Sequence, residues 1–94
     1  MNIDTMRTQP DPRENMRKII VSQGASFGEL LARNDAKVAP QYRADSQRVS
    51  LERIKQVGSN SKLTQQDKEV FEAAAMRAYE ETGRSLGLPS LPRQ

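Results

Sequence analysis

The 94-residue sequence contains no histidine, no cysteine and no tryptophan, and two tyrosines and two phenylalanines are its only aromatic residues. The missing cysteine excludes disulfides, thiolate nucleophiles and zinc sites built on sulfur. The missing histidine removes the commonest metal ligand and general base, and with them the Ser-His and Cys-His catalytic pairs. We therefore expect a protein that is not an enzyme and that uses no metal and no cofactor.

Several functional segments are also missing. Neither of the glycine-rich phosphate loops, GxxxxGK[ST] and GxGxxG, occurs in the sequence. No apolar run approaches the ~20 residues that a membrane-spanning helix needs. The first residues lack the apolar stretch of a secretory signal. We therefore expect a cytoplasmic protein with no membrane contact.

Apolar residues are scarce as well. Only 35% of the chain is hydrophobic and 29% is charged, and the mean hydropathy is −0.80. A single domain of this length has a thin core, and this composition lies near the border of foldability. Short helices with apolar stripes are hard to satisfy within one thin bundle, which favours a homo-oligomer or another partner.

The spacing of apolar residues and the capping signals predict an all-α fold, a small bundle of about four short helices. Asp11 and Pro12 are typical of a helix start, Gly24 of a helix end, and Ser26 of a second start. Gly83 follows the longest apolar stripe and is expected to end the last helix. The helices are expected over about 12–23, 27–34, 46–57 and 65–82, with a loop at 58–61 and a threonine cap at Thr64.

Both ends differ in composition from this helical part. We expect a flexible tail at 1–10, a helical domain at 11–83 and an extended Leu/Pro tail at 84–94. The prolines prevent a regular helix in the last segment. It is either disordered, with its leucines exposed as a docking peptide, or folded back as a strap over the bundle. The candidate partner contacts are Leu86, Leu88 and Leu91, together with Tyr79 on the longest helix.

Charges separate along the chain, although the net charge is only +3. Residues 48–62 carry four bases and one acid, whereas residues 67–81 carry five acids and two bases. One interpretation is that the basic segment binds phosphates, with an exposed aromatic ring stacking on a base. In the alternative, the basic and acidic helices pack side by side. The candidate nucleic-acid-binding residues are Arg48, Arg53, Lys55, Lys62 and Tyr42.

Five short motifs also follow one another along the chain. They are Ala39-Pro40, the segment 48–54, Ser61-Lys62-Leu63, the segment 71–74, and Leu86-Gly87-Leu88-Pro89. In their order and approximate spacing, residues from about 26 to 89 resemble the N-terminal helical part of the RecT-like single-strand annealing proteins of phages. Residues 80–85 depart from that layout as an insertion. The resemblance implies contact with single-stranded DNA. It does not imply annealing, because the family's larger DNA-binding core comes after the last motif, and here only five residues follow Pro89.

Two functions follow from these observations. The first is a small accessory protein of a phage or mobile element that binds nucleic acid, in particular single-stranded DNA, through the basic segment 48–62. The second is a protein-binding module, an inhibitor or adaptor of a larger partner such as an anti-defence or anti-CRISPR protein, with no nucleic-acid role. Its contacts would come from the stripe of Phe27, Leu30 and Leu31, the alanine face of the last helix and the Leu/Pro tail.

Overall fold

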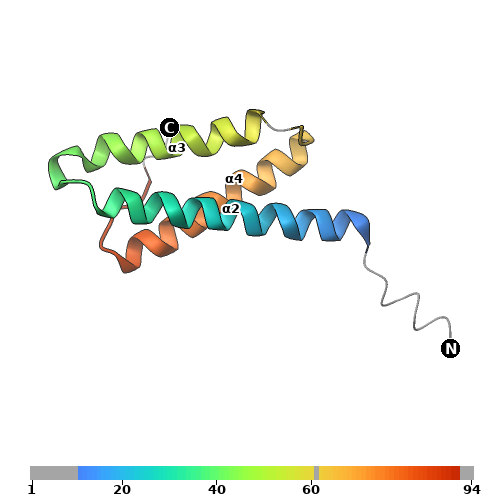
Figure 1. The fold of residues 1–94 in the computed structure, drawn as a ribbon, viewed down its shortest axis with the longest axis horizontal. Coiled ribbons are helices and arrows are strands. Elements are labelled where there is room, and N and C mark those ends of the chain that lie inside the picture. The colour runs from blue at the N-terminus through green and yellow to red at the C-terminus, as the bar shows by residue number, and fades with distance from the viewer. Residues whose placement is uncertain (1–10, 61, 92–94) are drawn as a thin grey trace.

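The structure is a computed structural model that describes residues 11–60 and 62–91, and every regular element in these ranges is helical. Three α-helices follow in order, α2 (Pro12–Ala36), α3 (Arg43–Asn60) and α4 (Gln65–Ser85), with a short 3-10 helix η1 (Pro40–Tyr42) before α3. α2 and α4 make the most extensive contact, and α3 packs against both (Figure 1). The all-α prediction is confirmed, but the expected number of four helices is wrong, since these residues form three. The tail expected at 1–10 lies outside the described residues.

The first two expected helices are in fact one continuous helix, α2. Gly24 does not end a helix and Ser26 does not begin one. Gly24 instead allows α4 to approach, because a Cβ atom at this position would lie 2.7 Å from the Phe71 carbonyl oxygen. At Gly28, one turn later, a Cβ atom would overlap the backbone of Ala75. These glycines are therefore packing residues rather than helix stops, and this is why the prediction failed.

The predicted helix caps are present at the starts of α2 and α4. Asp11 Oδ1 accepts a hydrogen bond from the Arg13 N–H at 3.0 Å, and the helix begins at the next residue, a proline. Thr64 Oγ1 accepts from the Asp67 N–H at 3.1 Å. Each cap satisfies a backbone donor that the first turn leaves unpaired. Both helix starts are confirmed.

Arg43 joins the end of α2 to the start of α3. Its guanidinium donates hydrogen bonds to the carbonyl oxygens of Val38 at 3.0 Å and Ala36 at 3.2 Å. Ala36 is the last residue of α2 and Val38 follows its C-cap, and at this end of a helix acceptors lack helical partners and a positive charge is favourable. α3 begins at this arginine, earlier than expected, and continues through Gly58 to Asn60. The loop expected at 58–61 is therefore wrong for residues 58–60.

α4 ends at Ser85 rather than at Gly83. The stop is Gly87, whose φ of 81° is a left-handed conformation that glycine adopts without strain. The Leu88 N–H donates to the Gly83 carbonyl oxygen at 2.7 Å, and the Gly87 N–H donates to that of Arg84 at 3.3 Å. This pair of bonds is a Schellman motif, which reverses the chain at the end of a helix.

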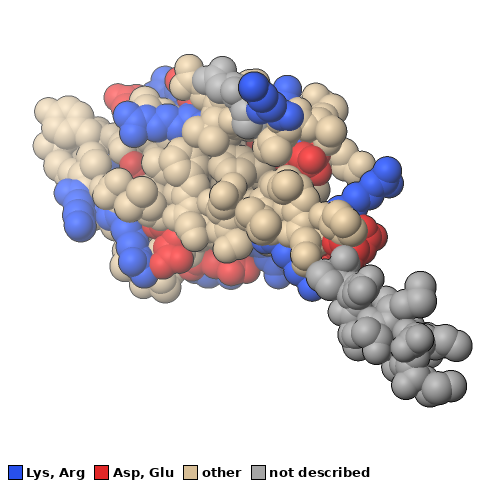
Figure 2. Space-filling model, turned by 45° about the vertical axis from the view of Figure 1, so that its right-hand side comes forward, with Lys and Arg blue, Asp and Glu red and all other residues tan. Residues whose placement is uncertain are grey.

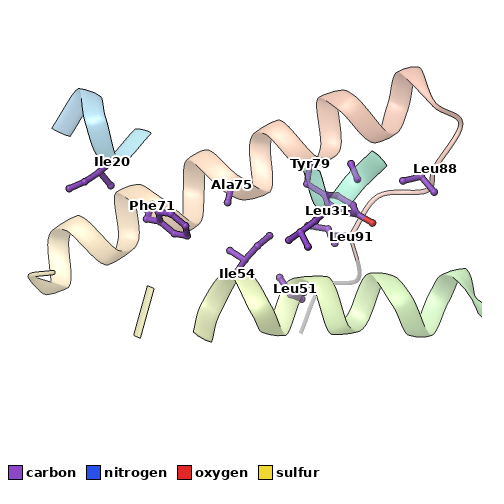
Figure 3. Close-up of a cluster of buried hydrophobic side chains, with 10 residues drawn as sticks. Ile20, Leu31, Leu51, Ile54, Phe71, Ala75, Tyr79, Leu88 and Leu91 are labelled. Carbon is purple, nitrogen blue, oxygen red and sulfur yellow. The ribbon is translucent and has the colours of Figure 1, made fainter. Parts of the chain in front are cut away.

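The hydrophobic core lies between the three helices, and the segment after α4 closes one end of it (Figure 3). Leu88 and Leu91 are buried there beside Tyr79. Gln47 of α3 holds the returning chain, because its Nε2 donates to the Pro89 carbonyl oxygen at 2.8 Å. Of the two forms expected for the Leu/Pro tail, the structure has the strap, as far as Leu91.

Candidate functional site

A buried polar cluster lies where the three helices meet. Asp35 of α2 is 3% exposed, and its carboxyl oxygens accept hydrogen bonds from three hydroxyl groups. The donors are Tyr79 of α4 at 2.6 Å, Ser50 of α3 at 2.7 Å, and Ser46 of α3. Burial and the bond to Asp35 raise the pKa of the Tyr79 hydroxyl well above its usual range. Because these hydroxyls point into the core, we assign the cluster to holding the helices together and not to chemistry on a ligand.

The predicted nucleic-acid-binding residues of α3 do not share one face. Arg48 and Lys55 are seven residues apart and lie on one side of the helix, whereas Arg53 lies roughly 140° around the axis from Arg48. Arg48 also forms an ion pair with Asp45, one turn earlier. The bases therefore form no single strip. The alternative, that the basic helix packs beside the acidic one, agrees with the contact between α3 and α4.

Tyr42 and Lys62 lie at opposite ends of α3. Tyr42 belongs to η1, just before the helix, and is 61% exposed. Lys62 is exposed in the segment that follows the helix. The 18-residue helix between them is about 27 Å long. A nucleic-acid base stacked on Tyr42 would therefore be remote from Lys62, and the structure does not bring the five predicted residues into one site.

Three of the four predicted partner contacts are core residues. Tyr79, Leu88 and Leu91 are buried, and Leu86 is the member of the set that is exposed. The alanine face of α4 is covered as well, since Ala75 is fully buried against α2. The leucines are apolar enough to dock a partner, but the helix reversal after α4 turns two of them inward. In this folded form, Leu86 is the leucine of the described tail that stays at the surface.

The N-terminal half of α2 lies outside the candidate sites predicted from the sequence, whereas Leu30, further along the helix, belongs to the predicted partner stripe of Phe27, Leu30 and Leu31. Residues 11–19 are all exposed, and this end of the helix projects beyond α3 and α4 (Figure 1). Met16, Ile19 and Leu30 expose 50%, 49% and 55% of their surface. Their spacing places them on one side of the helix, with Gln23 between them. We call Met16, Ile19, Gln23 and Leu30 the exposed flank.

A signal for the exposed flank was present in the sequence. The apolar residues of α2 form two stripes, one through Ile20 and Leu31 and the other through Ile19 and Leu30. The first stripe is buried and the second is exposed. A helix at the edge of a three-helix bundle covers one stripe against its neighbours, so the second stripe remains at the surface. Figure 2 shows a broad face with little charge at its centre and with charged side chains around its margin.

On another side, the exposed half of α2 forms an open groove with the start of α4. Its lining includes Arg13, Arg17 and Val21 from α2, and Val70 from α4. The two helices touch at Gly24 and separate towards the N-terminus of α2 (Figure 1). The groove is thus the open continuation of the α2–α4 interface. Polar side chains of both helices complete its walls.

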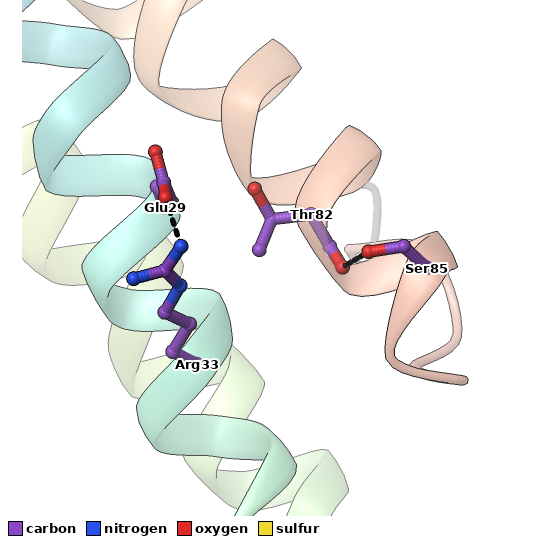
Figure 4. Close-up of polar contacts among 4 residues, drawn as sticks. All are labelled: Glu29, Arg33, Thr82 and Ser85. Carbon is purple, nitrogen blue, oxygen red and sulfur yellow. Dashed lines mark hydrogen bonds and ion pairs between the residues drawn. The ribbon is translucent and has the colours of Figure 1, made fainter.

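Two ion pairs lie in the C-terminal halves of α2 and α4, away from the groove, and each joins two residues of the same helix. Glu29 and Arg33 of α2 pair at 2.5 Å (Figure 4), and Arg77 and Glu81 of α4 pair at 3.1 Å. Such exposed pairs contribute about 0–1 kcal/mol each. Nearby, Ser85 Oγ donates to the Thr82 carbonyl oxygen at 2.8 Å and closes the last turn of α4 (Figure 4). The charges of these two pairs are therefore matched by neighbours within their own helix, in contrast to the arginines of the groove.

The described residues contain neither a candidate metal site nor a candidate membrane-spanning helix. There, no group of three or more acidic, histidine or cysteine side chains is arranged to hold a metal ion. None of the three described α-helices combines the length and the apolar composition that crossing a bilayer requires. No protein-family model, no curated protein and no solved structure matches this chain. The resemblance of residues 26–89 to RecT-like proteins therefore stays a prediction from the sequence.

Proposed function

We propose that this chain is a non-catalytic protein-binding module whose contact surface is the exposed flank of α2. The observation that supports this function is the exposed flank, where three large apolar side chains on one side of α2, two of them in its projecting N-terminal end, are each about half exposed. Isolated apolar residues are common on protein surfaces, but a row along one helix side is typical of a helix that packs into a partner's groove.

Energetic magnitudes favour the exposed flank over the basic residues as the main source of affinity. Burying a large aliphatic side chain completely contributes about 1.5–3 kcal/mol. Met16, Ile19 and Leu30 have half of their surface left to bury, so together they offer roughly 3 kcal/mol. Basic residues gain affinity for a nucleic acid when several of them contact one phosphate backbone and release its counterions, but the bases of α3 are spread around the helix. Binding to a protein is therefore better supported than binding to nucleic acid.

Site-specific crosslinking tests the proposal, and the absence of cysteine from the chain makes the labelling unambiguous. Ile19→Cys, Val21→Cys and, as the control, Ala73→Cys would each carry a thiol-linked photo-crosslinker. All three positions lie on exposed helix surface, but Ala73 is on α4. We expect a discrete adduct with a protein of the source cell from position 19, competed away by unlabelled chain. Equal labelling from position 73, or no adduct at all, would contradict the proposal.

The nucleic-acid hypothesis has a separate test. We expect a labelled single-stranded oligonucleotide not to bind at roughly 50 mM salt, where phosphate contacts are strong, or at roughly 200 mM. Tight binding at the lower salt that is lost at the higher salt would favour the accessory-protein hypothesis. Loss of that binding in an Arg53→Glu, Lys55→Glu variant would then assign the contact to α3.

A further inference from the structure

We propose that the groove between the exposed half of α2 and the start of α4 receives an acidic amphipathic helix of the partner protein. This inference rests on the proposed protein-binding function and specifies the chemistry of the partner. It concerns the side of α2 next to the exposed flank, with Met16 at the boundary between the two surfaces, and it is tested through Arg13 and Arg17, which lie outside the flank. A test of the groove can therefore fail while protein binding through the flank still stands.

The groove is positioned to extend a helix interface that already exists. Gly24 sets the closest approach of α2 to α4, and the groove opens from there towards the start of both helices. Val21 of α2 and Val70 of α4 supply apolar surface on its two walls, with Met16 further out. A third helix laid along this line would pack on both walls as α2 and α4 pack on each other. An extended peptide has no sheet edge to join within the described residues, which contain helices only.

Two arginines give the groove its preference for acidic partners. Arg13 and Arg17 are one turn apart, and Arg17 is one turn before Ile20 and two before Gly24, so they continue the side of α2 that faces the core. This side of α2 is apolar where α4 covers it and basic beyond the point where α4 ends its contact. Among the described residues, neither guanidinium lies within ion-pair distance of a carboxylate.

The chemistry of arginine makes carboxylates suitable ligands in this groove. A guanidinium binds a carboxylate through two parallel hydrogen bonds, and its aliphatic stem packs on apolar surface. Acidic side chains of a partner helix would therefore pair with Arg13 and Arg17, while its apolar side chains contact the valines of the two walls.

Other groove residues favour a peptide over a polyphosphate. Glu14 and Asp67 also line the groove, and their charges would repel the closely spaced phosphates of a nucleic acid strand. A helix presents separate carboxylates with apolar residues between them, so it can place its charges opposite Arg13 and Arg17, or the neighbouring Lys18, and away from Glu14 and Asp67. A second copy of this chain is disfavoured because the outer side of α4 interleaves acids with Arg77 and Arg84.

Two synthetic helices provide a direct test. The first, of about 18 residues and five turns, carries leucines at helical spacing with glutamates beside them. The matched peptide has lysine in place of every glutamate. We expect the acidic peptide alone to bind in a fluorescence anisotropy titration. We also expect it to shift the amide NMR signals of residues around Arg17, Val21 and Val70.

Charge reversal supplies the matched control. Arg13→Glu with Arg17→Glu is expected to lower affinity for the acidic peptide at least about tenfold, equivalent to ~1.4 kcal/mol, and to introduce binding of the basic peptide. Arg48→Glu with Arg53→Glu makes the same change in net charge on α3 and is expected to leave the affinity unchanged. Circular dichroism checks that both variants stay folded, since all four arginines are exposed.

Several results would overturn the inference. They are failure of the acidic peptide to bind, equal effects of the two charge-reversed variants, and amide shifts confined to other surfaces. An oligonucleotide that binds the groove in preference to the acidic peptide would assign it to nucleic acid. Self-association abolished by the Arg13, Arg17 variant would assign it to a second copy. Crosslinking from position 19 but not from position 21 would leave the proposed function standing and remove the groove from it.

Discussion

The two halves of α2 belong to one continuous helix but have opposite roles in the molecule. The C-terminal half, from Gly24 to Asp35, meets α4 through small residues and joins all three helices through its buried carboxyl group. The N-terminal half, residues 12–19, is exposed throughout and carries arginines where the buried half has apolar residues. The difference shows that neighbouring turns of a helix can serve stability and partner binding separately. Substitutions in the two halves should therefore separate these properties.

The largest effect is expected at Asp35 in the buried half. Asp35→Ala removes the acceptor of the buried hydroxyl groups of Tyr79 and Ser50 and of the half-buried hydroxyl group of Ser46, and each unsatisfied buried polar group costs about 1–3 kcal/mol. We expect a loss of about 4 kcal/mol in the free energy of unfolding, measured by urea denaturation, out of a typical ~5–15 kcal/mol for a domain. Asp35→Asn keeps one acceptor oxygen and should cost about half as much. A loss below about 1 kcal/mol for Asp35→Ala would mean that the cluster does not hold the helices together.

A somewhat smaller loss is expected at Gly28. Gly28→Ala places a Cβ atom on the backbone of Ala75 and forces α2 and α4 apart, so it should cost about 3 kcal/mol as overpacking. Gly58→Ala is the matched control, because its Cβ atom would meet the Glu72 side chain at an ordinary 3.6 Å. The control should gain up to about 1 kcal/mol from helix propensity. Similar thermal midpoints for the two variants would contradict the close approach of α2 and α4.

Alkaline pH should lower the stability of the fold through Tyr79 of α4, which donates a hydrogen bond to Asp35 in the buried half of α2. The folded state raises the pKa of this hydroxyl, so it keeps a proton that an unfolded tyrosine loses near pH 10. Stability is therefore constant with respect to this group below pH 10 and falls above it, with a slope approaching about 1.4 kcal/mol per pH unit. Urea denaturation of a Tyr42→Phe variant, in which Tyr79 is the only tyrosine, measures the slope. A Tyr79→Phe, Tyr42→Phe variant with the same slope would exclude Tyr79 as its source.

The smallest effect on stability is expected in the exposed half. Met16→Ser with Ile19→Ser changes side chains that are half exposed, so the free energy of unfolding should change by less than about 0.5 kcal/mol. The same variant should lose the crosslinked adduct formed from position 21. A destabilisation similar to that of Gly28→Ala would show that the exposed flank packs within the protein and is not a contact surface.

The sequence predicted local features well because their causes are local. The caps at Asp11 and Thr64 depend on a side chain that reaches an N–H two or three residues later, and the structure confirms both. The predicted helix end at Gly24 was wrong because a glycine has two common uses. It can end a helix, or it can let a neighbouring helix pack closely, and the choice depends on which element faces it in the folded protein. Gly24 has α4 opposite it, whereas Gly87 has open space around it and a left-handed conformation.

The candidate surface was harder to predict than the fold. Arg48, Arg53 and Lys55 are close along the chain, which predicts one basic site, but the helical turn separates Arg53 from the other two around α3. The tail leucines are apolar and lie among prolines, which predicts partner contacts, but the chain reversal at Gly87 buries Leu88. Asp35 was not singled out, because one acid in a charged chain has no distinctive pattern until the donors from α3 and α4 surround it.

Composition alone determined that this chain lacks the side chains for histidine or cysteine chemistry, and apolar periodicity determined that it is helical. Both properties depend on residue types and short-range spacing, so they are independent of how the helices meet. The tertiary structure decided which apolar stripe of α2 is covered, because α4 can approach only the side that carries Gly24 and Gly28. It thereby decided that the other stripe, with Met16, Ile19 and Leu30, remains at the surface.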